Sequence, residues 1–183
     1  MEKILFLNGS PRLKGNTHFA LKTLEEQIDK TKSEVEFIDV TKFNVAGCIA
    51  CDSCKRNNGK CFMSDDTNEL VQKIVDADTL IFGSPVYWWG ISAQLKALID
   101  KMYSKAHGTE LTDKKKRVGL ISVGADEIGA EQYRIISSQF RCICEYLGWE
   151  FFIDEAISAH NPNDLSTQNE TRSLLKELGE SLN

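Results

Sequence analysis

Short apolar runs alternate with longer segments of helical periodicity along the chain, and this alternation limits the possible folds more than any other feature. Residues 3–7, 35–40, 79–83, 117–123 and 149–157 are predicted strands. Residues 17–30, 70–75, 92–103, 131–147 and 171–182 carry apolar side chains at helical spacing and are predicted helices. Strands that alternate with helices in this way build β-α-β units, which place the strands parallel in one sheet.

Several predicted strands are apolar at nearly every position, as in ILFL at residues 4–7 and TLIFG at residues 79–83. A strand of this kind is buried on both faces, so helices should cover both sides of the sheet. Five such strands predict an α/β fold of the flavodoxin-like type, with a parallel sheet in the order 2-1-3-4-5. No internal repeat interrupts the pattern, and we predict one domain over residues 1–183.

The charge balance and hydropathy argue against nucleic-acid and membrane partners. The net charge is −5, and the single basic run, at residues 114–117, is expected to be a solvated entry to a strand. No apolar stretch approaches the length of a membrane span, and the first residues do not form a signal-peptide pattern. We therefore expect a cytoplasmic protein, in which cysteines stay reduced.

Four cysteines lie within a connection that has no secondary-structure periodicity, at about residues 41–64. Their spacing is C-x2-C-x2-C-x6-C, and they are Cys48, Cys51, Cys54 and Cys61. Long connections inside a compact domain are uncommon and usually functional or disordered, and four thiolates suit an iron-sulfur cluster or zinc. A redox dithiol and a set of thiols that bind no metal are the remaining alternatives.

Polar residues follow the first predicted strand and open a helix. They are Ser10, Arg12, Asn16 and Thr17, with Gly15 among them to allow a close backbone approach. A hydroxyl, a guanidinium and free N–H groups at a helix N-terminus make a ready site for an anion such as phosphate. The alternative is a polar turn in which Asn16 or Thr17 only caps the helix.

Aromatic and small residues follow the third and fourth predicted strands. Pro85, Val86, Tyr87 and Trp88 form the first group, and Gly124 lies in the second. Ligands of doubly wound sheets bind beyond the carboxyl ends of the strands, so these loops should border one site. The aromatic side chains could stack on a planar ring, fill a subunit interface or belong to the core.

The motifs S-P-R-x-x-G-N-T and G-S-P-V-Y-W, after the first and third strands, resemble the NADPH-dependent FMN reductase group of flavodoxin-fold proteins. The resemblance runs through roughly the first 105 residues and implies an FMN-binding domain. It implies that Ser10, Arg12, Asn16 and Thr17 hold the FMN phosphate. The same resemblance places residues 85–88 along the isoalloxazine ring and Gly124 in a third loop, and it implies a homodimer or tetramer built partly on residues 91–100.

Within that group, the cysteine run followed by Asp65 and Asp66 resembles the iron-sulfur flavoproteins. This resemblance implies that the four cysteines hold a [4Fe–4S] cluster close to FMN. Electrons would then pass between the two cofactors and a ferredoxin-like partner, and no side chain need act as a catalytic acid or base. The alternatives are an NAD(P)H-dependent FMN, quinone or nitroaromatic reductase without a cluster, acting on a small aromatic acceptor, and a flavin-free binding module.

The remaining chemically active side chains receive structural assignments from the sequence. Asp100 and Lys101 are expected on the solvated side of a helix, and Cys142 and Cys144 in or beside the core. The three histidines, His18, His107 and His160, are expected to have surface or capping roles.

Overall fold

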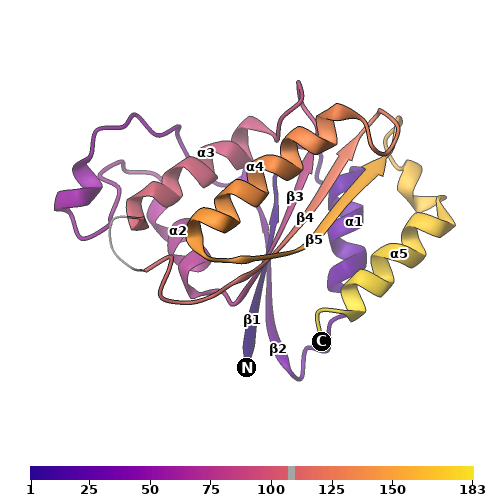
Figure 1. Cartoon of the computed structure of the whole chain (residues 1–183), viewed down its shortest axis with the longest axis horizontal. Helices are drawn as coiled ribbons and strands as arrows, with labels where there is room; N and C mark the ends of the chain where they lie inside the picture. Colours follow the sequence, from indigo (N-terminus) through magenta and orange to yellow (C-terminus); the bar gives the residue numbers. More distant parts are fainter. Residues whose placement is uncertain (107–109) are drawn as a thin grey trace.

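The parallel sheet organises the molecule (Figure 1). The computed structural model describes residues 1–106 and 110–183, so that His107 lies outside the described residues. In these ranges the strands pair in the order β2-β1-β3-β4-β5, which confirms the predicted flavodoxin-like α/β topology. The strands are β1 (Glu2–Asn8), β2 (Ser33–Asp39), β3 (Thr79–Pro85), β4 (Arg117–Gly124) and β5 (Glu150–Ser158).

Helices pack on both faces of the sheet, each group over its own hydrophobic cluster. One face carries α2 (Thr67–Asp76), α3 (Ala93–Lys101) and α4 (Glu131–Leu147). The other face carries α1 (Asn16–Glu25) and α5 (Asn169–Glu180). No helix within the described ranges is both long enough and apolar enough to cross a membrane.

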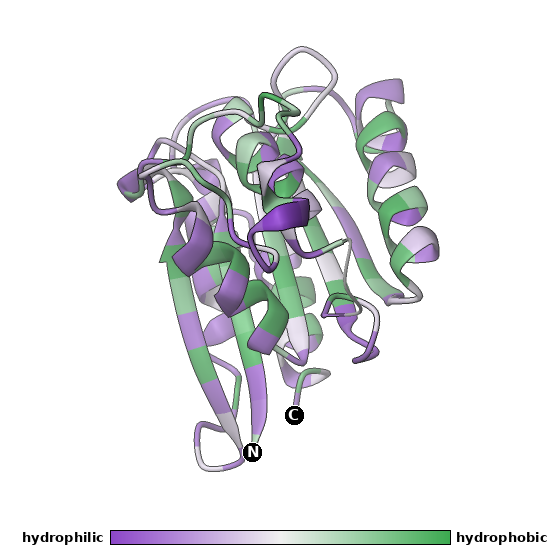
Figure 2. Cartoon of the chain, turned by 90° about the vertical axis from the view of Figure 1, so that its left-hand side faces the viewer, coloured by the Kyte–Doolittle hydropathy of each residue, from purple (hydrophilic) through white to green (hydrophobic). Residues whose placement is uncertain are grey.

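The central strands are buried because both of their faces meet helices. Residues 4–7 of β1 are at most 2% exposed, and the same strands are coloured largely hydrophobic in Figure 2. The helices in that view alternate hydrophobic and hydrophilic stretches, as expected when one side faces the sheet and the other faces water. At Gly83 a Cβ atom would lie 2.5 Å from Leu21 Cδ1, so a residue without a side chain lets α1 approach β3 closely.

Several predicted helix ends differ from the structure by a few residues, and for two helix termini the local reason is visible. Helix α1 ends at Glu25, because Gln27 and Ile28 form tighter i→i−3 hydrogen bonds to Leu24 and Glu25. The spacing of Asp66 and Glu69 predicts a capping box for α2, but the Asp66 side chain does not cap that helix. Its carboxylate instead accepts a hydrogen bond from the backbone N–H of Asn44.

Lys116 is buried, although the basic run that contains it is predicted to be solvated. It is 1% exposed, and its Nζ donates to the backbone carbonyls of Val75 (2.6 Å) and Ala77 at the end of α2. The ammonium therefore satisfies carbonyls that the helix itself leaves unpaired. Burial, with a smaller contribution from the charge of Lys114, lowers the pKa of Lys116 to about 8.

We expect this lysine to make the protein more stable relative to Lys116→Met as the pH rises from about 8 to 10.5. The folded-state pKa of Lys116 lies below the ordinary value, so in this pH window the unfolded chain binds more protons than the folded one. The free energy of unfolding therefore increases as the pH rises. The gain is at most on the order of 3 kcal/mol. Urea unfolding at several pH values measures it, with exposed Lys115→Met as the control. A difference between wild type and Lys116→Met that is flat with pH contradicts the prediction.

Candidate functional site

A pocket lies at the carboxyl end of the sheet, where the loops after four strands meet. It brings together seven residues of the predicted phosphate and ring sites and one of the third loop: Ser10, Arg12, Asn16, Thr17, Pro85, Val86, Tyr87 and Gly124. Gly15 and the segment at residues 159–162, after β5, complete most of the wall. No residue of that last segment was among the predicted site residues, although Asn161-Pro162 shortly after a strand is a typical turn signal.

The loop after β1 is held in a defined shape by its own hydrogen bonds. Asn8 Oδ1 accepts from the Ser10 N–H at 3.1 Å, and Ser10 Oγ accepts from the Arg12 N–H at 3.2 Å. Helix α1 follows with Gly15 at its N-cap, so no side chain caps its first N–H groups. Ser10 and Thr17 are both only 3% exposed and line the pocket. Buried hydroxyls beside an uncapped helix N-terminus fit an anionic group such as phosphate.

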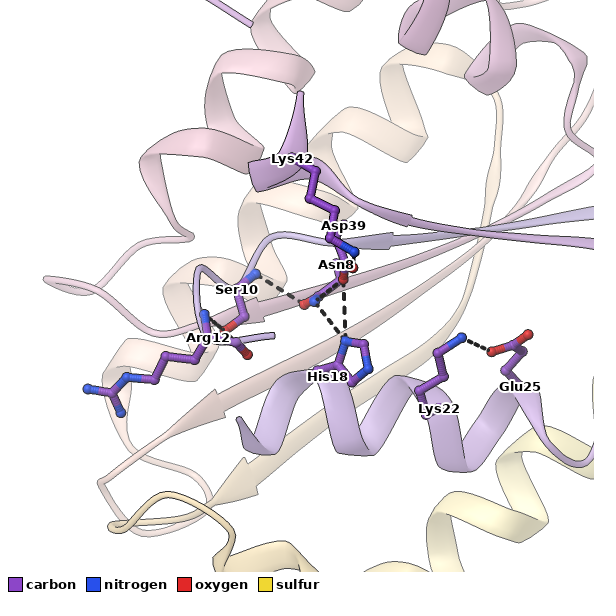
Figure 3. A network of polar contacts seen from close by, with 8 residues as sticks. All are labelled: Asn8, Ser10, Arg12, His18, Lys22, Glu25, Asp39 and Lys42. Atoms are coloured by element: carbon purple, nitrogen blue, oxygen red, sulfur yellow. Dashed lines mark hydrogen bonds and ion pairs between the residues drawn. The ribbon is translucent and has the colours of Figure 1, made fainter. Parts of the chain in front are cut away.

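A polar network fixes this loop to the neighbouring strand (Figure 3). Asn8 Nδ2 donates to Asp39 Oδ1 at 2.9 Å, His18 Nδ1 lies 3.3 Å from the same oxygen, and Lys42 Nζ lies 2.7 Å from Asp39 Oδ2. Burial alone would raise the pKa of Asp39, but the bonds from Lys42 and Asn8 outweigh it and lower that pKa. The Asp39 carboxylate therefore connects the ends of β1 and β2 with the first turns of α1. Arg12 extends away from this network in Figure 3.

Asn16 lines the pocket, but its side chain is used by the protein itself. Its Nδ2 donates to the Asn161 carbonyl at 2.8 Å, and its Oδ1 accepts from the Leu165 N–H at 3.3 Å. These bonds join the start of α1 to the loop after β5. A direct phosphate contact by the Asn16 side chain stays a prediction, while its role in shaping the pocket is visible.

The loop after β3 ends in a tight aromatic turn. Tyr87 and Gly90 exchange two backbone hydrogen bonds, of 2.8 and 3.0 Å, around Trp88 and Trp89. Both tryptophans have positive φ, 47° and 59°, which costs free energy for any residue other than glycine. Tyr87 lines the pocket, whereas Trp88 lies outside its lining and is 92% exposed. A contact between Trp88 and a ring in the pocket stays a prediction.

Ser92 links the aromatic turn to the loop after β1. Its Oγ donates to the Gly9 carbonyl at 2.6 Å and accepts from the Leu95 N–H at 3.4 Å, which confirms Ser92 as the N-cap of α3. Its backbone N–H donates to Ser84 Oγ at 2.9 Å. A Cβ atom on Gly9 would lie 2.7 Å from Leu95 Cβ. The two loops are thus packed against each other and joined by hydrogen bonds.

A second pocket is lined by all four clustered cysteines: Cys48, Cys51, Cys54 and Cys61. Cys54 is buried, and all four are free thiols. The two pockets share no lining residue. Among residues 1–106 and 110–183, no three histidine, cysteine, aspartate or glutamate side chains converge closely enough to hold a metal ion. The thiols therefore border one cavity without being gathered around its centre.

Two aspartates fasten the ends of the cysteine segment to each other. Asp66 Oδ2 accepts from the Asn44 N–H at 2.7 Å, and the Asp66 N–H donates to the Asn44 carbonyl at 2.9 Å. Asp65 Oδ2 accepts from the Ala46 N–H at 3.0 Å. Residues 44–46 and 65–66 are thus joined, and the segment between them, with its four cysteines, forms a closed loop.

Left-handed residues separate the first three cysteines. Ala50 has φ of 52° and Asp52 has φ of 57°. This conformation is uncommon for residues other than glycine, and it redirects the backbone on either side of Cys51. Hydrogen bonds from the Ser53 hydroxyl and N–H lower the pKa of the Cys51 thiol. The local backbone thus favours negatively charged sulfur.

Lys101, the last residue of α3, is buried against this segment, which corrects the prediction of a solvated side chain. It is 2% exposed, and its Nζ lies 3.0 Å from Met63 Sδ and 3.4 Å from Cys61 Sγ. Asp65 Oδ2 is 3.8 Å away. Asn68 holds Cys61 from the other side, with its side-chain amide accepting from the Cys61 N–H and donating to the Cys61 carbonyl.

Comparison with known proteins shows which family this chain matches. The family model of NADPH-dependent FMN reductases matches residues 2–144. Two iron-sulfur flavoproteins of Methanocaldococcus jannaschii are 38% and 33% identical over 73% and 71% of this chain, which spans 67% and 65% of their own lengths. An FMN-dependent NADH-azoreductase from Bacillus anthracis, solved in complex with FMN, superposes with a TM-score of 0.69 at 16% identity. It covers 100% of this chain, which covers 99% of it, and this likeness concerns the fold.

Proposed function

This chain belongs to the NADPH-dependent FMN reductase family, and on that premise we propose that FMN-dependent redox chemistry takes place at the pocket beyond the carboxyl ends of the strands. The observation that carries the proposal is the convergence of buried hydroxyls and an uncapped helix N-terminus on one wall with Pro85, Val86 and Tyr87 on the other. A phosphate fits the first wall and a flat ring the second. We propose residues 1–183 as one FMN-binding domain.

The protein's part in this chemistry is binding and orientation. Bound FMN would supply one- and two-electron transfer. Ser10, Thr17 and the first N–H groups of α1 would hold the phosphate, and Arg12 would add a positive charge from the rim. Gly124 lets the loop after β4 lie close, because a Cβ there would be 2.9 Å from the Tyr133 hydroxyl.

We propose further that Cys48, Cys51, Cys54 and Cys61 hold a [4Fe–4S] cluster, which would supply one-electron exchange. Support comes from the shared pocket, from the left-handed residues between the cysteines and from relatives named iron-sulfur flavoproteins. The thiols would have to draw together when the cluster is assembled, since they do not converge in this structure.

Electron transfer between the two sites is the function that this arrangement supports best. Helix α3 connects them, because Ser92 at its start bonds the loop after β1 and Lys101 at its end lines the cysteine pocket. Its nine residues span about 14 Å. NAD(P)H or a ferredoxin-like protein would be the electron source, and a ferredoxin-like protein or a small aromatic molecule the acceptor.

A second candidate is an NAD(P)H-dependent FMN, quinone or nitroaromatic reductase whose cysteines hold no cluster. The observation that favours it is the lack of converged metal ligands among the described residues. Purification without oxygen decides between the two. About four iron and four acid-labile sulfide per chain, together with FMN, support the cluster. FMN without iron or sulfide leaves the simple reductase, and a protein without FMN contradicts both.

Arg12→Ala is expected to weaken FMN binding about tenfold, because a charge-assisted hydrogen bond to phosphate is lost. Riboflavin, which has no phosphate, should bind the variant as it binds wild type. Fluorescence titration of both flavins into the apoprotein gives the two affinities. Arg134→Ala is the matched control, since Arg134 is exposed on α4 and pairs with Glu131. Equal losses for FMN and riboflavin would count against a phosphate role.

We also propose that the chain forms a homodimer or tetramer. The support is the exposure of Tyr87, Trp88 and Trp89 at 42%, 92% and 52%, beside the start of α3. Aromatic side chains in such a turn commonly bury their surface against another protein or a ligand. Light scattering coupled to gel filtration measures the assembly, and a monomer at all concentrations contradicts this proposal.

A further inference from the structure

Lys101 is a buried cation whose closest partners are sulfur atoms. Within the described ranges, the atoms that its Nζ meets at hydrogen-bond distance are Met63 Sδ and Cys61 Sγ. An ammonium has three donors, and thioether or thiol sulfur is a weak acceptor for them. A buried charge is costly unless it is well paired, so this arrangement needs a stronger negative partner.

Within the part of the chain that the structure describes, the carboxylate paired with Lys101 is Asp65, and it neutralises the ammonium only in part. Asp65 Oδ2 lies 3.8 Å from Nζ and already accepts the Ala46 N–H, while Asp65 Oδ1 accepts the Thr67 N–H. Asp65 is itself 5% exposed in its side chain. Both oxygens of the Asp65 carboxylate thus accept backbone hydrogen bonds. The Lys101 ammonium keeps hydrogen-bond donors that point toward the cysteine pocket.

We propose that Lys101 is a positioning residue of the cysteine site, holding Cys61 and supplying a fixed positive charge that raises the reduction potential of the group bound there. The inference rests on the proposed cluster. Four thiolates add negative charge to a pocket whose other charged lining residue, Asp52, is paired with Lys55 at 3.0 Å. A buried cation beside one ligand favours the more reduced, more negative state of the cluster, and hydrogen bonds to the ligand sulfur act in the same direction.

The position of Lys101 on α3 extends the argument to the link between the two sites. The helix begins on the loop that borders the flavin pocket and ends with this ammonium against Cys61. A charge fixed at that end acts more strongly on the potential of the cysteine side than on the flavin side, because Lys101 contacts Cys61 and does not line the flavin pocket. The residue therefore biases the direction of electron flow between the sites without touching FMN.

The test compares Lys101→Met, Lys101→Arg and Lys96→Met in the cofactor-loaded protein. Methionine keeps the length of the side chain and removes its charge, arginine keeps the charge, and Lys96 is an exposed lysine of the same helix, paired with Asp100. Iron content and the midpoint potential, followed by electron paramagnetic resonance, are measured for each. We expect Lys101→Met to reduce the equilibrium constant for one-electron reduction at least tenfold, or about 59 mV. The potentials of Lys101→Arg and Lys96→Met should stay close to wild type.

Asp65→Asn provides a second variant of opposite sign. It leaves the Lys101 charge less neutralised, so the potential should rise in protein that keeps its full iron content. Iron content is measured with it, because asparagine can accept only one of the two backbone N–H groups that Asp65 accepts. The positioning role is also supported if Lys101→Met loses its iron while Lys101→Arg keeps both iron and FMN. Full iron with an unchanged potential in Lys101→Met overturns the inference. Absence of iron from the wild-type protein instead overturns the proposed cluster, so the two failures are distinguishable.

Discussion

Cys54→Ser is expected to remove essentially all iron and acid-labile sulfide from the protein purified without oxygen, while FMN remains at the wild-type level. Cys54 lies in the middle of the cysteine spacing and is the buried member of the four. Serine nearly preserves the size of the side chain, but its hydroxyl is a far poorer ligand for iron-sulfur clusters than thiolate. FMN should be unaffected because the two pockets have no lining residue in common.

The matched control is Cys142→Ser, which changes an exposed cysteine on α4 outside both pockets. It should keep iron, sulfide and FMN. Retention of all the iron in Cys54→Ser would show that this thiol is not a ligand. Joint loss of iron and FMN, with the fold intact by circular dichroism, would show that the two sites are not separable in the way proposed here.

Ser10→Asp should weaken FMN binding about a hundredfold or more, while riboflavin loses only a few-fold. An aspartate oxygen can still accept the Arg12 N–H that Ser10 Oγ accepts now, so the loop keeps its local bond. The new carboxylate, however, would be buried in the wall that is proposed to hold a phosphate dianion. Like charges at such a site cost several kcal/mol, and about 1.4 kcal/mol corresponds to tenfold in affinity.

Titration calorimetry with FMN and with riboflavin separates this charge effect from damage to the pocket. Ser10→Ala serves as the neutral control and should lose much less FMN affinity than Ser10→Asp. A hundredfold loss for riboflavin as well would mean that the loop has collapsed. Unchanged FMN affinity in Ser10→Asp would show that the FMN phosphate does not bind at this wall.

The sequence was sufficient for the fold because the relevant signal is local and strong. Helix α4 has the predicted bounds, Glu131–Leu147, since one apolar face repeats without interruption. The sheet order follows from buried parallel strands joined by helices. Much of the pocket lining was predicted for the same reason, because the ends of such strands meet at one edge of the sheet.

The side chains that sequence patterns misplaced depend on contacts between distant segments. Lys101 falls at a helix position where lysine is normally solvated, and it is buried against the distant segment that carries Cys61, Met63 and Asp65. Lys116 is covered in the same way at the end of α2. The spacing of the four cysteines also does not show how close their sulfur atoms lie, and in the described residues they line one cavity without converging on its centre.

The strained turn at Trp88 and Trp89 has a spectroscopic consequence. The chain has three tryptophans, and the third, Trp149, is 6% exposed and donates its indole N–H to the Leu111 carbonyl. In a single subunit the two indoles of the turn are open to a collisional quencher such as iodide, and Trp149 is shielded from it. In the proposed homodimer or tetramer the turn would be covered as well, so the quenchable fraction of the intrinsic fluorescence reports whether the aromatic turn is in contact with another subunit.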